Sequence, residues 1–389
     1  MKAAMVSTYP PMQCGIGNYS RLLYQALAGL EGAPTLHVLT ETGHRRDSNL
    51  DGSIQVHQVY SRRGEYGDAL VEKARELDLQ VLHFQYAPDL LGEDERLPNT
   101  LAALRRDGRR TVVTLHTVYG PRQERVLLGK HSTRWFHQHL AQHADCLLVH
   151  QEAMRQALLE QGVPDDRIAV IPHGTVMEDA VGRPEARANL GLDPDATLFL
   201  FFGFIHIQKN VHTVVRAFTD RAADMPGSKL LVAGRPFGGH WYNKRYLTWM
   251  KSLVATRELT DRVIFHDDFI PGPLASAYIK ASDVMLLPHK QAYASASGVF
   301  HQAAGADKAV ICAKGPKFQD GMRILAAHPN LLVEATDRDG WGQAMVDLAS
   351  SADLRAQVAA TMSDYGRATA WPVVARTTSD LYNRLVTAK

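Results

Sequence analysis

The chain alternates short β-rich runs with longer amphipathic stretches along all of its 389 residues. This alternation is typical of parallel sheets whose strands are joined by crossover helices. In the first half, strands are expected at Lys2–Ser7, Thr35–Thr40, Ile54–Val59, Gln80–Gln85, Thr111–His116, Asp145–His150 and Ile168–Ile171. In the second half, they are expected at Thr197–Phe202, Lys229–Ala233, Arg262–His266, Asp283–Leu287, Ala309–Cys312 and Asn330–Val333. The pattern predicts an α/β protein with two doubly wound sheets.

A segment rich in helix and strand breakers, Pro172–Pro184, separates the two sets of strands and has no hydrophobic periodicity. We therefore expect one domain over residues 1–175 and a second over residues 185–370, since the chain is long enough for two. The last segment, Trp371–Ala388, has a helical pattern. Ligands of such sheets bind at the carboxyl ends of the strands, in the cleft that the two domains are expected to face.

The charge balance excludes a general polyanion binder. Forty-three basic and 41 acidic residues leave a formal net charge of +2, so we expect no nucleic-acid partner. Three basic pairs, at 45–46, 105–106 and 109–110, are typical of solvated surface. They leave open a peripheral contact with a membrane.

The cysteines and the N-terminal segment bear on the compartment. Cys14, Cys146 and Cys312 are widely separated and lack metal-ligand spacing, which fits a reducing cytosol. Lys2 interrupts the first apolar run, and the sequence shows neither a signal peptide nor a long apolar segment. We expect a cytoplasmic protein, with the inner face of the membrane as a further location.

The stretch Thr8–Tyr19 follows the first expected strand directly. Its two prolines and two glycines forbid regular structure, and apolar residues recur at helical spacing from Asn18 onward. The free backbone N–H groups at the start of such a helix can hold an anion. Gly15 and Gly17 do not complete the dinucleotide-binding fingerprint, so on residues alone this loop is either a binding loop or a tight turn.

The segment Tyr9–Gly17 resembles the opening loop of the retaining glycosyltransferases of family 4, which have the GT-B fold. Further stretches are similar to that family in the same order along nearly the whole chain. They are Val112–Thr117, Ile171–Gly174, Phe202–Asn210, Ala296–Val299 and Lys308–Ile311. Each piece is short, but the ordered series is specific.

The resemblance implies two Rossmann-like domains facing a cleft, with residues 371–389 returning to the first domain. It implies transfer of a hexose from a nucleoside diphosphate sugar to a hydroxyl, with retention and with neither a metal nor a cofactor. The acceptor would be a glycan, a lipid-linked compound or a small molecule. The subgroup that the chain resembles favours GDP-mannose over UDP-glucose. The alternatives are a GT-B epimerase or phosphorylase, and a catalytically silent protein that binds nucleotide sugars.

Two residues are predicted to carry the chemistry. His116 closes a very apolar strand, where a histidine is often structural, and the resemblance places it beside the donor sugar. Lys209 lies at the mouth of the first strand of the second domain, where a cation at a helix start is unfavourable unless an anion is near. His206 stands where the resembling motif usually carries arginine, and it donates to phosphate only in part at neutral pH.

The remaining predicted site residues follow the same motifs. Donor contacts are assigned to Gly15, Gly17, Gly203, His206, Lys209, Gly234, Arg235, Asp268, Phe269, Ser295, Ser297, Gly298, Val299 and Gln302. Acceptor contacts are assigned to Gln85, Tyr86, Tyr119 and Arg122. For the serines the alternative is a simple helix cap, and for the aromatic residues it is an ordinary strand end. Asp268 and the aspartate before it fit a loop better than a metal pair.

The sequence departs from the family pattern at one point. Most members carry two glutamates eight positions apart, and the alignment puts Ala294 and Gln302 at these places. Gln302 can still bond a ribose hydroxyl, whereas Ala294 has no polar group. This departure is the reason for keeping the silent nucleotide-sugar-binding protein as an alternative.

Overall fold

The structure is a computed structural model that describes residues 1–387 except 44–48, 121–131, 179–181, 269 and 292. Two compact units divide the chain. Unit 1 comprises Met1–Gly174, Tyr293–Ala296 and Trp371–Lys389, and unit 2 comprises Thr175–Ala292 and Ser297–Ala370. The division falls at Gly174, near the start of the breaker-rich segment, and a short piece of the second half belongs to unit 1.

The sheet of unit 1 has eight strands in the order β3-β4-β2-β1-β5-β6-β7-β8. Its strands are β1 (Lys2–Val6), β2 (Thr35–Glu41), β3 (Leu50–Asp51), β4 (Ile54–Tyr60), β5 (Val81–Tyr86), β6 (Arg110–Leu115), β7 (Cys146–Val149) and β8 (Ile168–Val170). Each expected strand is confirmed to within two residues at either end. The sequence pattern missed β3, which has two residues and pairs with β4 in antiparallel fashion, whereas the other described pairs are parallel.

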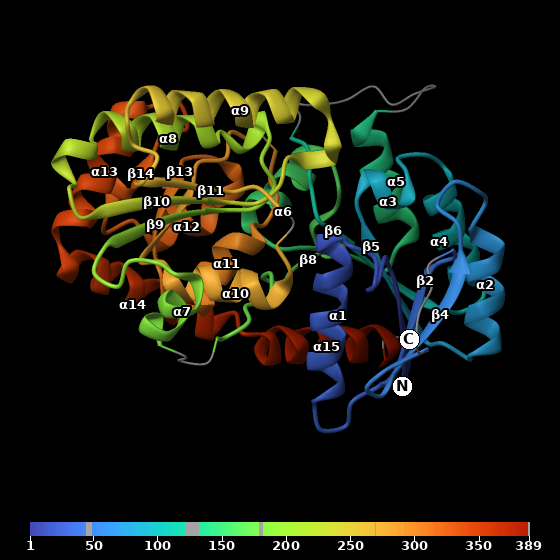
Figure 1. Cartoon of the computed structure of the whole chain (residues 1–389). Coiled ribbons are helices and arrows are strands. Elements are labelled where there is room, and N and C mark those ends of the chain that lie inside the picture. The colour runs from blue at the N-terminus through green and yellow to red at the C-terminus, as the bar shows by residue number, and fades with distance from the viewer. Residues whose placement is uncertain (44–48, 121–131, 179–181, 269, 292, 388–389) are drawn as a thin grey trace. The chain divides into compact units, whose positions relative to one another are not determined.

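Side chains of β1 alternate between two apolar cores. Ala3 and Met5 belong to one cluster, and Ala4 and Val6 to the other, so the strand is buried on both faces. This explains its unbroken apolar sequence. The helices are α1 (Gly15–Ala28), α2 (Gly67–Glu76), α3 (Pro88–Leu91), α4 (Arg96–Arg106), α5 (Thr133–His143), α6 (Glu152–Glu160) and α15 (Trp371–Thr387). Helix α15 packs against α1 (Figure 1).

The sheet of unit 2 has six parallel strands in the order β11-β10-β9-β12-β13-β14. They are β9 (Thr197–Phe202), β10 (Ser228–Ala233), β11 (Val263–His266), β12 (Val284–Leu287), β13 (Ala309–Ala313) and β14 (Leu332–Val333). The last is shorter than expected because a 3₁₀ turn, η7 (Pro329–Leu331), precedes it. The helices are α7 (Arg183–Leu190), α8 (Val211–Asp220), α9 (Trp241–Thr256), α10 (Gly272–Ala281), α11 (Gly298–Gly305), α12 (Gln319–Ile324), α13 (Arg338–Ser350) and α14 (Ala352–Ala368).

Each sheet reverses its strand order once. In unit 1 the chain builds outward from β1 in one direction and from β5 in the other, and in unit 2 the same change occurs between β9 and β12. Helices α8 and α9 lie on one side of the strands of unit 2, and α10 and α11 on the other (Figure 1). Loops diverge at such a switch point and leave room for a ligand at the carboxyl ends of the strands.

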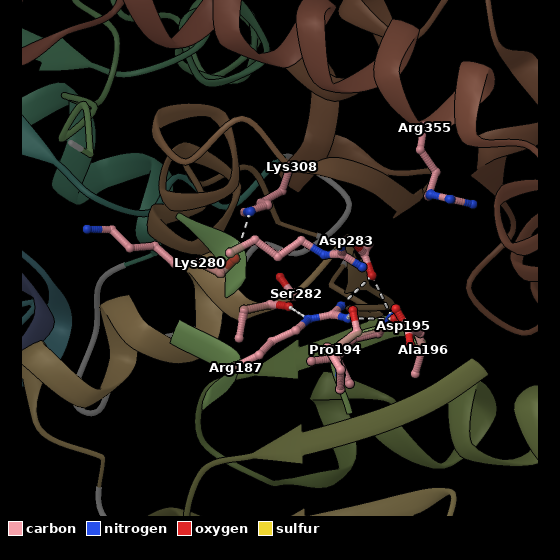
Figure 2. Close-up of polar contacts among 12 residues, drawn as sticks. Arg187, Pro194, Asp195, Ala196, Lys280, Ser282, Asp283, Lys308 and Arg355 are labelled. Atoms are coloured by element: carbon pink, nitrogen blue, oxygen red, sulfur yellow. Dashed lines mark hydrogen bonds and ion pairs between the residues drawn. The ribbon is translucent and has the colours of Figure 1, made fainter. Parts of the chain in front are cut away.

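A buried arginine joins helix α7 to the amino ends of strands β9 and β12 in unit 2 (Figure 2). Arg187 of α7 is 1% exposed, and its guanidinium lies 2.7 Å from the Asp283 carboxylate. The same carboxylate accepts the backbone N–H of Leu198, at 2.7 Å, in β9. Arg187 also donates to the carbonyl oxygens of Ala281, Asp193, Pro194 and Ala196. This network joins α7, β9 and the start of β12, so it fixes the strands whose far ends form the switch point.

Replacing Arg187 by methionine is expected to lower the free energy of unfolding by about 3–5 kcal/mol, because buried acceptors lose their donor. The matched control is Arg183→Met, which removes the other arginine on Asp283. Its side chain is 41% exposed, and its loss should cost less than about 1 kcal/mol. Urea denaturation of both variants measures the difference, and equal losses would contradict the assignment.

Candidate functional site

In unit 1, His116 lies at the head of a chain of buried polar side chains. It follows β6 directly, and its Nε2 lies 2.7 Å from Gln85 Oε1 on the neighbouring strand β5. Gln85 Nε2 is 3.2 Å from His83 Nε2, and His83 Nδ1 is 2.6 Å from the hydroxyl of Tyr382 in α15. The chain therefore links His116 to the C-terminal helix through two residues of β5.

Burial sets the charge of His116, and the contact with Gln85 sets which of its ring nitrogens carries the hydrogen. Burial lowers the pKa of His116 well below its usual value, and the nearby His150, His173 and His83 lower it further. The ring is therefore neutral at neutral pH. Because an amide oxygen only accepts, the contact with Gln85 puts the hydrogen on Nε2 and leaves Nδ1 as an acceptor. Such a ring can accept a hydrogen bond from a hydroxyl and is poorly suited to act as a strong base.

His116 is one of four rings that lie around the ring of Tyr19. The ring of Tyr19, in α1, lies 5.0 Å from His116, 5.2 Å from His150, 5.1 Å from His173 and 5.2 Å from Trp371, centroid to centroid. Among the described residues, His150 Nε2 and Trp371 Nε1 are buried without a hydrogen-bond partner. Unsatisfied buried polar atoms are rare and destabilising, which marks this cluster as a candidate site.

Sequence reasoning found His116 in this cluster and missed the other four residues. His150 had been seen only as the end of an expected strand, and His173 only as part of the motif Ile171–Gly174. Tyr19 and Trp371 were seen as positions of helical pattern. Their convergence depends on the strand order, which the sequence alone does not give.

The loop before α1 shows why its two glycines differ. Helix α1 begins at Gly15, three residues before the expected start at Asn18. A Cβ on Gly17 would lie 3.1 Å from the carbonyl oxygen of Thr8, whereas one on Gly15 would meet nothing within 4 Å. Gly17 is thus required for close packing of the helix on the loop. Gly15 faces open space, and its donor contact stays a prediction.

The predicted acceptor residues lie in different environments. Gln85 and Tyr86 are buried, because β5 is a central strand covered on both faces. Tyr86 packs 5.1 Å from the ring of Phe136, and Gln85 contacts His116. Both side chains are buried in this structure, and their contact with an acceptor stays a prediction. Tyr119 is half-buried with its ring 5.2 Å from that of Tyr293, and Arg122 lies outside the described residues.

In unit 2, two predicted glycines bring neighbouring loops together. Gly203 directly follows β9 and has φ of 130°, and Gly234 directly follows β10 and has φ of 142°. A Cβ on Gly234 would lie 2.0 Å from the carbonyl oxygen of Gly203, which only glycine avoids. Arg235 follows, with its guanidinium carbon 5.6 Å from the ring centroid of the exposed Phe204.

Lys209 lies at the switch point of unit 2. Its Nζ is 2.7 Å from Nε2 of His289, which comes two residues after β12, so the contact crosses from the β9 loop to the β12 loop. Lys209 ends the 3₁₀ turn η3 (Ile207–Lys209), and α8 begins only at Val211. Lys209 therefore lies one short turn before α8 and not at its first residue.

Burial controls the charges around Lys209. Burial lowers the pKa of Lys209 to about 8, and burial together with the Lys209 charge lowers that of His206 to about 4. Burial, and then the Lys209 charge, lowers the pKa of His289 well below its ordinary value. Both histidines are thus neutral at neutral pH, and His206 does not supply the cation that an arginine would.

The α11 region supports the helix-cap interpretation of Ser297. Its Oγ accepts the backbone N–H of Phe300 at 3.4 Å, and the helix begins at Gly298. Val299 is half-buried and Gln302 is exposed on the second turn. Ser295 is buried and belongs to unit 1. Asp268 is exposed, and Phe269 lies outside the described residues.

Ala294 lies in an unexpected place. It belongs to unit 1, is 4% exposed, and forms a β-bridge with Val118, two residues beyond His116. The two backbone hydrogen bonds measure 2.9 and 3.1 Å. A glutamate at position 294 would therefore bury its carboxylate in an apolar cluster that includes Val118. Packing therefore explains why no glutamate stands at this position.

The described part of the chain has neither a candidate metal site nor a candidate membrane-spanning helix. In it, no group of three or more histidine, cysteine, aspartate or glutamate side chains could hold a metal ion. No helix within those residues has the length and apolar character to cross a membrane.

Two sequence models of known families match the chain. The model described as "Glycosyltransferase Family 4" matches residues 14–178, and that described as "Glycosyl transferases group 1" matches residues 182–361. With the two parallel-sheet units, these matches define a glycosyltransferase with the GT-B fold. The chain belongs to the family 4 type of these enzymes.

Known proteins agree with this assignment. A D-inositol 3-phosphate glycosyltransferase from Corynebacterium urealyticum is 27% identical over 77% of this chain and 72% of its own length. The next two relatives with that name are matched over 59% and 51% of their lengths. A sucrose-phosphate synthase structure from Thermosynechococcus elongatus has a TM-score of 0.76 at 19% identity and covers all of both chains. Anabaena Alr3699/HepE in complex with UDP-glucose has a TM-score of 0.69 at 14% identity, covering 98% of this chain and 99% of its own.

Replacing Gln85 by leucine is expected to lower kcat about two- to tenfold, because His116 loses the acceptor that orients it. This factor corresponds to the net free energy of one hydrogen bond. The apparent affinity for the donor should hardly change. Tyr86→Phe is the matched control, since the described residues offer its buried hydroxyl no partner. Steady-state kinetics with the nucleotide sugar that the wild-type protein turns over test this. A kcat for Gln85→Leu equal to that of the wild type would return Gln85 to a purely structural role.

Proposed function

We propose that this glycosyltransferase moves a hexose from a nucleoside diphosphate sugar to a hydroxyl group, with retention and without a metal ion. The observation that carries the proposal is the half-buried ammonium of Lys209 at the switch point of unit 2, 2.7 Å from neutral His289. An ammonium that is desolvated beside uncharged partners favours an anionic ligand. A diphosphate is the anion that a nucleotide sugar brings.

The chemistry follows from where charge develops. Departure of the nucleoside diphosphate increases negative charge on its oxygens, and Lys209 stabilises that charge more in the transition state than in the bound substrate. His289 accepts a hydrogen bond from Lys209 and so fixes the direction of the ammonium. Nδ1 of His116 accepts a hydrogen bond from a hydroxyl group of the sugar. The leaving diphosphate takes the proton of the acceptor hydroxyl, so the flanking carboxylates of a glycosidase are not required.

The identities of the donor and of the acceptor are further parts of the proposal. The motif resemblance favours GDP-mannose, whereas Alr3699/HepE was solved with UDP-glucose. The relatives named D-inositol 3-phosphate glycosyltransferase support a small phosphorylated cyclitol as the first acceptor to test. A panel of GDP-mannose and UDP-glucose, scored by thermal shift, would identify the donor, because a ligand of the native state raises its melting temperature.

Turnover distinguishes the alternatives. A transferase consumes the donor far faster with an acceptor than without one, whereas an epimerase converts the donor alone. A silent protein that binds nucleotide sugars shows a thermal shift and no turnover with any acceptor.

Transfer should survive a strong chelator, because the proposal assigns the cationic work to side chains. Activity is measured with excess EDTA and after addition of Mg²⁺ or Mn²⁺. Loss of turnover with EDTA, and its recovery with either metal, would contradict the metal-free mechanism.

Lys209→Ala should cost about 2–4 kcal/mol of transition-state stabilisation, as expected for one preorganised electrostatic donor. Lys209→Arg should recover only part of this, since the two cations differ in shape and reach. Because the pKa of Lys209 is about 8, affinity for the nucleoside diphosphate should fall as the pH rises above that value. Lys290→Ala, at an exposed lysine beside His289, is the control. Unchanged kcat/KM in Lys209→Ala would move the diphosphate site, with Arg235 the next candidate.

A further inference from the structure

The exposed aromatic side chains of the described residues gather on one part of unit 2. Five Phe, Trp and Tyr side chains are exposed in those residues, and all of them lie between positions 204 and 249. They are Phe204, Phe237, Trp241, Tyr242 and Trp249, which we call the aromatic face. Trp241 is the most exposed of them, at 68%. Single exposed apolar residues are common in soluble proteins, whereas a group of large ones marks an interaction surface.

Local contacts hold the aromatic face together. Phe204 comes after β9 and Phe237 after β10, and their ring centroids lie 5.5 Å apart because these strands are neighbours in the sheet. Buried Asn243, in the first turn of α9, donates to the carbonyl oxygen of Phe237 at 2.9 Å and so ties the β10 loop to that helix. The rings of Trp241 and Tyr242 lie 6.1 Å apart at the start of α9. The sheet and the helix therefore fix the positions from which these rings project.

Helix α9 is amphipathic, but its outer side is not purely polar. Leu247 and Met250 are buried and pack α9 on the core of unit 2, beside α8 (Figure 1). Trp241, Arg245 and Trp249 are exposed and follow one another at a spacing of four residues. Residues at this spacing share one side of a helix. The helix thus presents two tryptophans and a cation on its solvent side.

Cations accompany the two tryptophans. The guanidinium carbon of Arg245 lies 5.7 Å from the ring centroid of Trp241, and that of Arg216, in α8, lies 4.8 Å from the ring centroid of Trp249. Both distances are short enough for cation–π attraction. Residues 225–257 contain six lysines and arginines and no aspartate or glutamate. Most of the aromatic face therefore lies in a positively charged stretch of the chain.

The positive charge at the start of α9 is not neutralised within the described part of the chain. Lys244 and Arg245 are exposed, and neither forms an ion pair with any described residue. The basic pairs that the sequence suggested for a membrane contact differ. Arg109 and Arg110 form ion pairs with aspartates, at 3.2 Å each, and the pair at 45–46 lies outside the described residues. The charge of Lys244 and Arg245 is therefore available to an anionic partner.

We propose that the aromatic face and the cations beside it bind the surface of a bilayer that contains anionic lipids. Tryptophan and tyrosine favour the boundary between headgroups and acyl chains, and lysine and arginine are attracted to anionic headgroups. A neutral glycan would not require the cations. The outer side of α9 is convex, which suits a lipid surface better than the groove in which proteins hold single-stranded nucleic acid. The inference is independent of the proposed function, because lipid binding requires no nucleotide sugar.

The experiment measures sedimentation of the whole chain with vesicles of phosphatidylcholine alone, or of phosphatidylcholine and phosphatidylglycerol in equal amounts. Trp241→Gln tests the aromatic face, and Lys244→Gln combined with Arg245→Gln tests its charge. The charge control replaces both arginines of 105–106 by glutamine, which removes the same charge from exposed positions of α4. The apolar control is Val373→Gln, at a side chain of α15 that is 49% exposed. Thermal unfolding is recorded for every variant.

Wild type is expected to sediment with the phosphatidylglycerol vesicles and far less with phosphatidylcholine alone. Added salt should weaken the binding, because it screens the charges. Lys244→Gln with Arg245→Gln should weaken partition into the anionic vesicles about thirtyfold, and Trp241→Gln at least about tenfold. Both controls should bind as wild type does. All melting temperatures should stay close to that of wild type, since the replaced side chains are exposed.

The proposal is overturned if wild type binds neither kind of vesicle or both equally, or if the 105–106 variant loses as much binding as the variant at Lys244 and Arg245. Two other partners are also tested. Without vesicle binding, self-association that Trp241→Gln abolishes would make the face an interface between copies of the chain, and binding of a single-stranded oligonucleotide would make it a nucleic-acid surface. Either result overturns the proposal. Vesicle binding by a chain that binds no nucleotide sugar would support this inference and contradict the proposed function.

Discussion

The hydrogen bond between Lys209 and His289 is the contact on which the account of this enzyme depends. It exists because β9, which ends at Phe202, and β12, which begins at Val284, are neighbours in the sheet although they lie far apart in the sequence. Parallel neighbours put their following loops at one edge, so a lysine and a histidine meet there. A desolvated ammonium favours an anionic ligand, and the point where the strand order reverses is where such a fold leaves room for a ligand.

Unit 1 positions a neutral imidazole, that of His116, through a chain of buried polar side chains. Gln85 and His83 form this chain, and Tyr382 anchors it in helix α15. The chain terminus is therefore coupled to the position of His116. Ala294 adds a second connection, because its bridge to Val118 joins the segment before α11 to the strand end that carries His116. The buried position of Ala294 makes the absence of the usual glutamate a matter of packing.

Much of this could be predicted from the sequence. Apolar runs such as Thr197–Phe202 identify buried parallel strands, and motif order identified the family. The roles that it gives to His116 and Lys209 stay predictions. The rest depends on long-range contacts. His150 carries no local signal of function, since its place beside Tyr19 follows from which strands are neighbours. The burial of Gln85 and Tyr86, which were assigned to acceptor contacts, was not predictable, because a strand end looks the same whether its strand is central or at an edge. The two-residue strand β3 is too short for any periodicity.

A crystal structure of the enzyme with UDP or GDP, whichever the donor panel selects, tests the central claim most directly. The account predicts a non-bridging phosphate oxygen within hydrogen-bond distance of Lys209 Nζ, about 2.7–3.2 Å, at the carboxyl ends of β9 and β12. A diphosphate held by Arg235 at the end of β10, with Lys209 bonded only to His289, would contradict it.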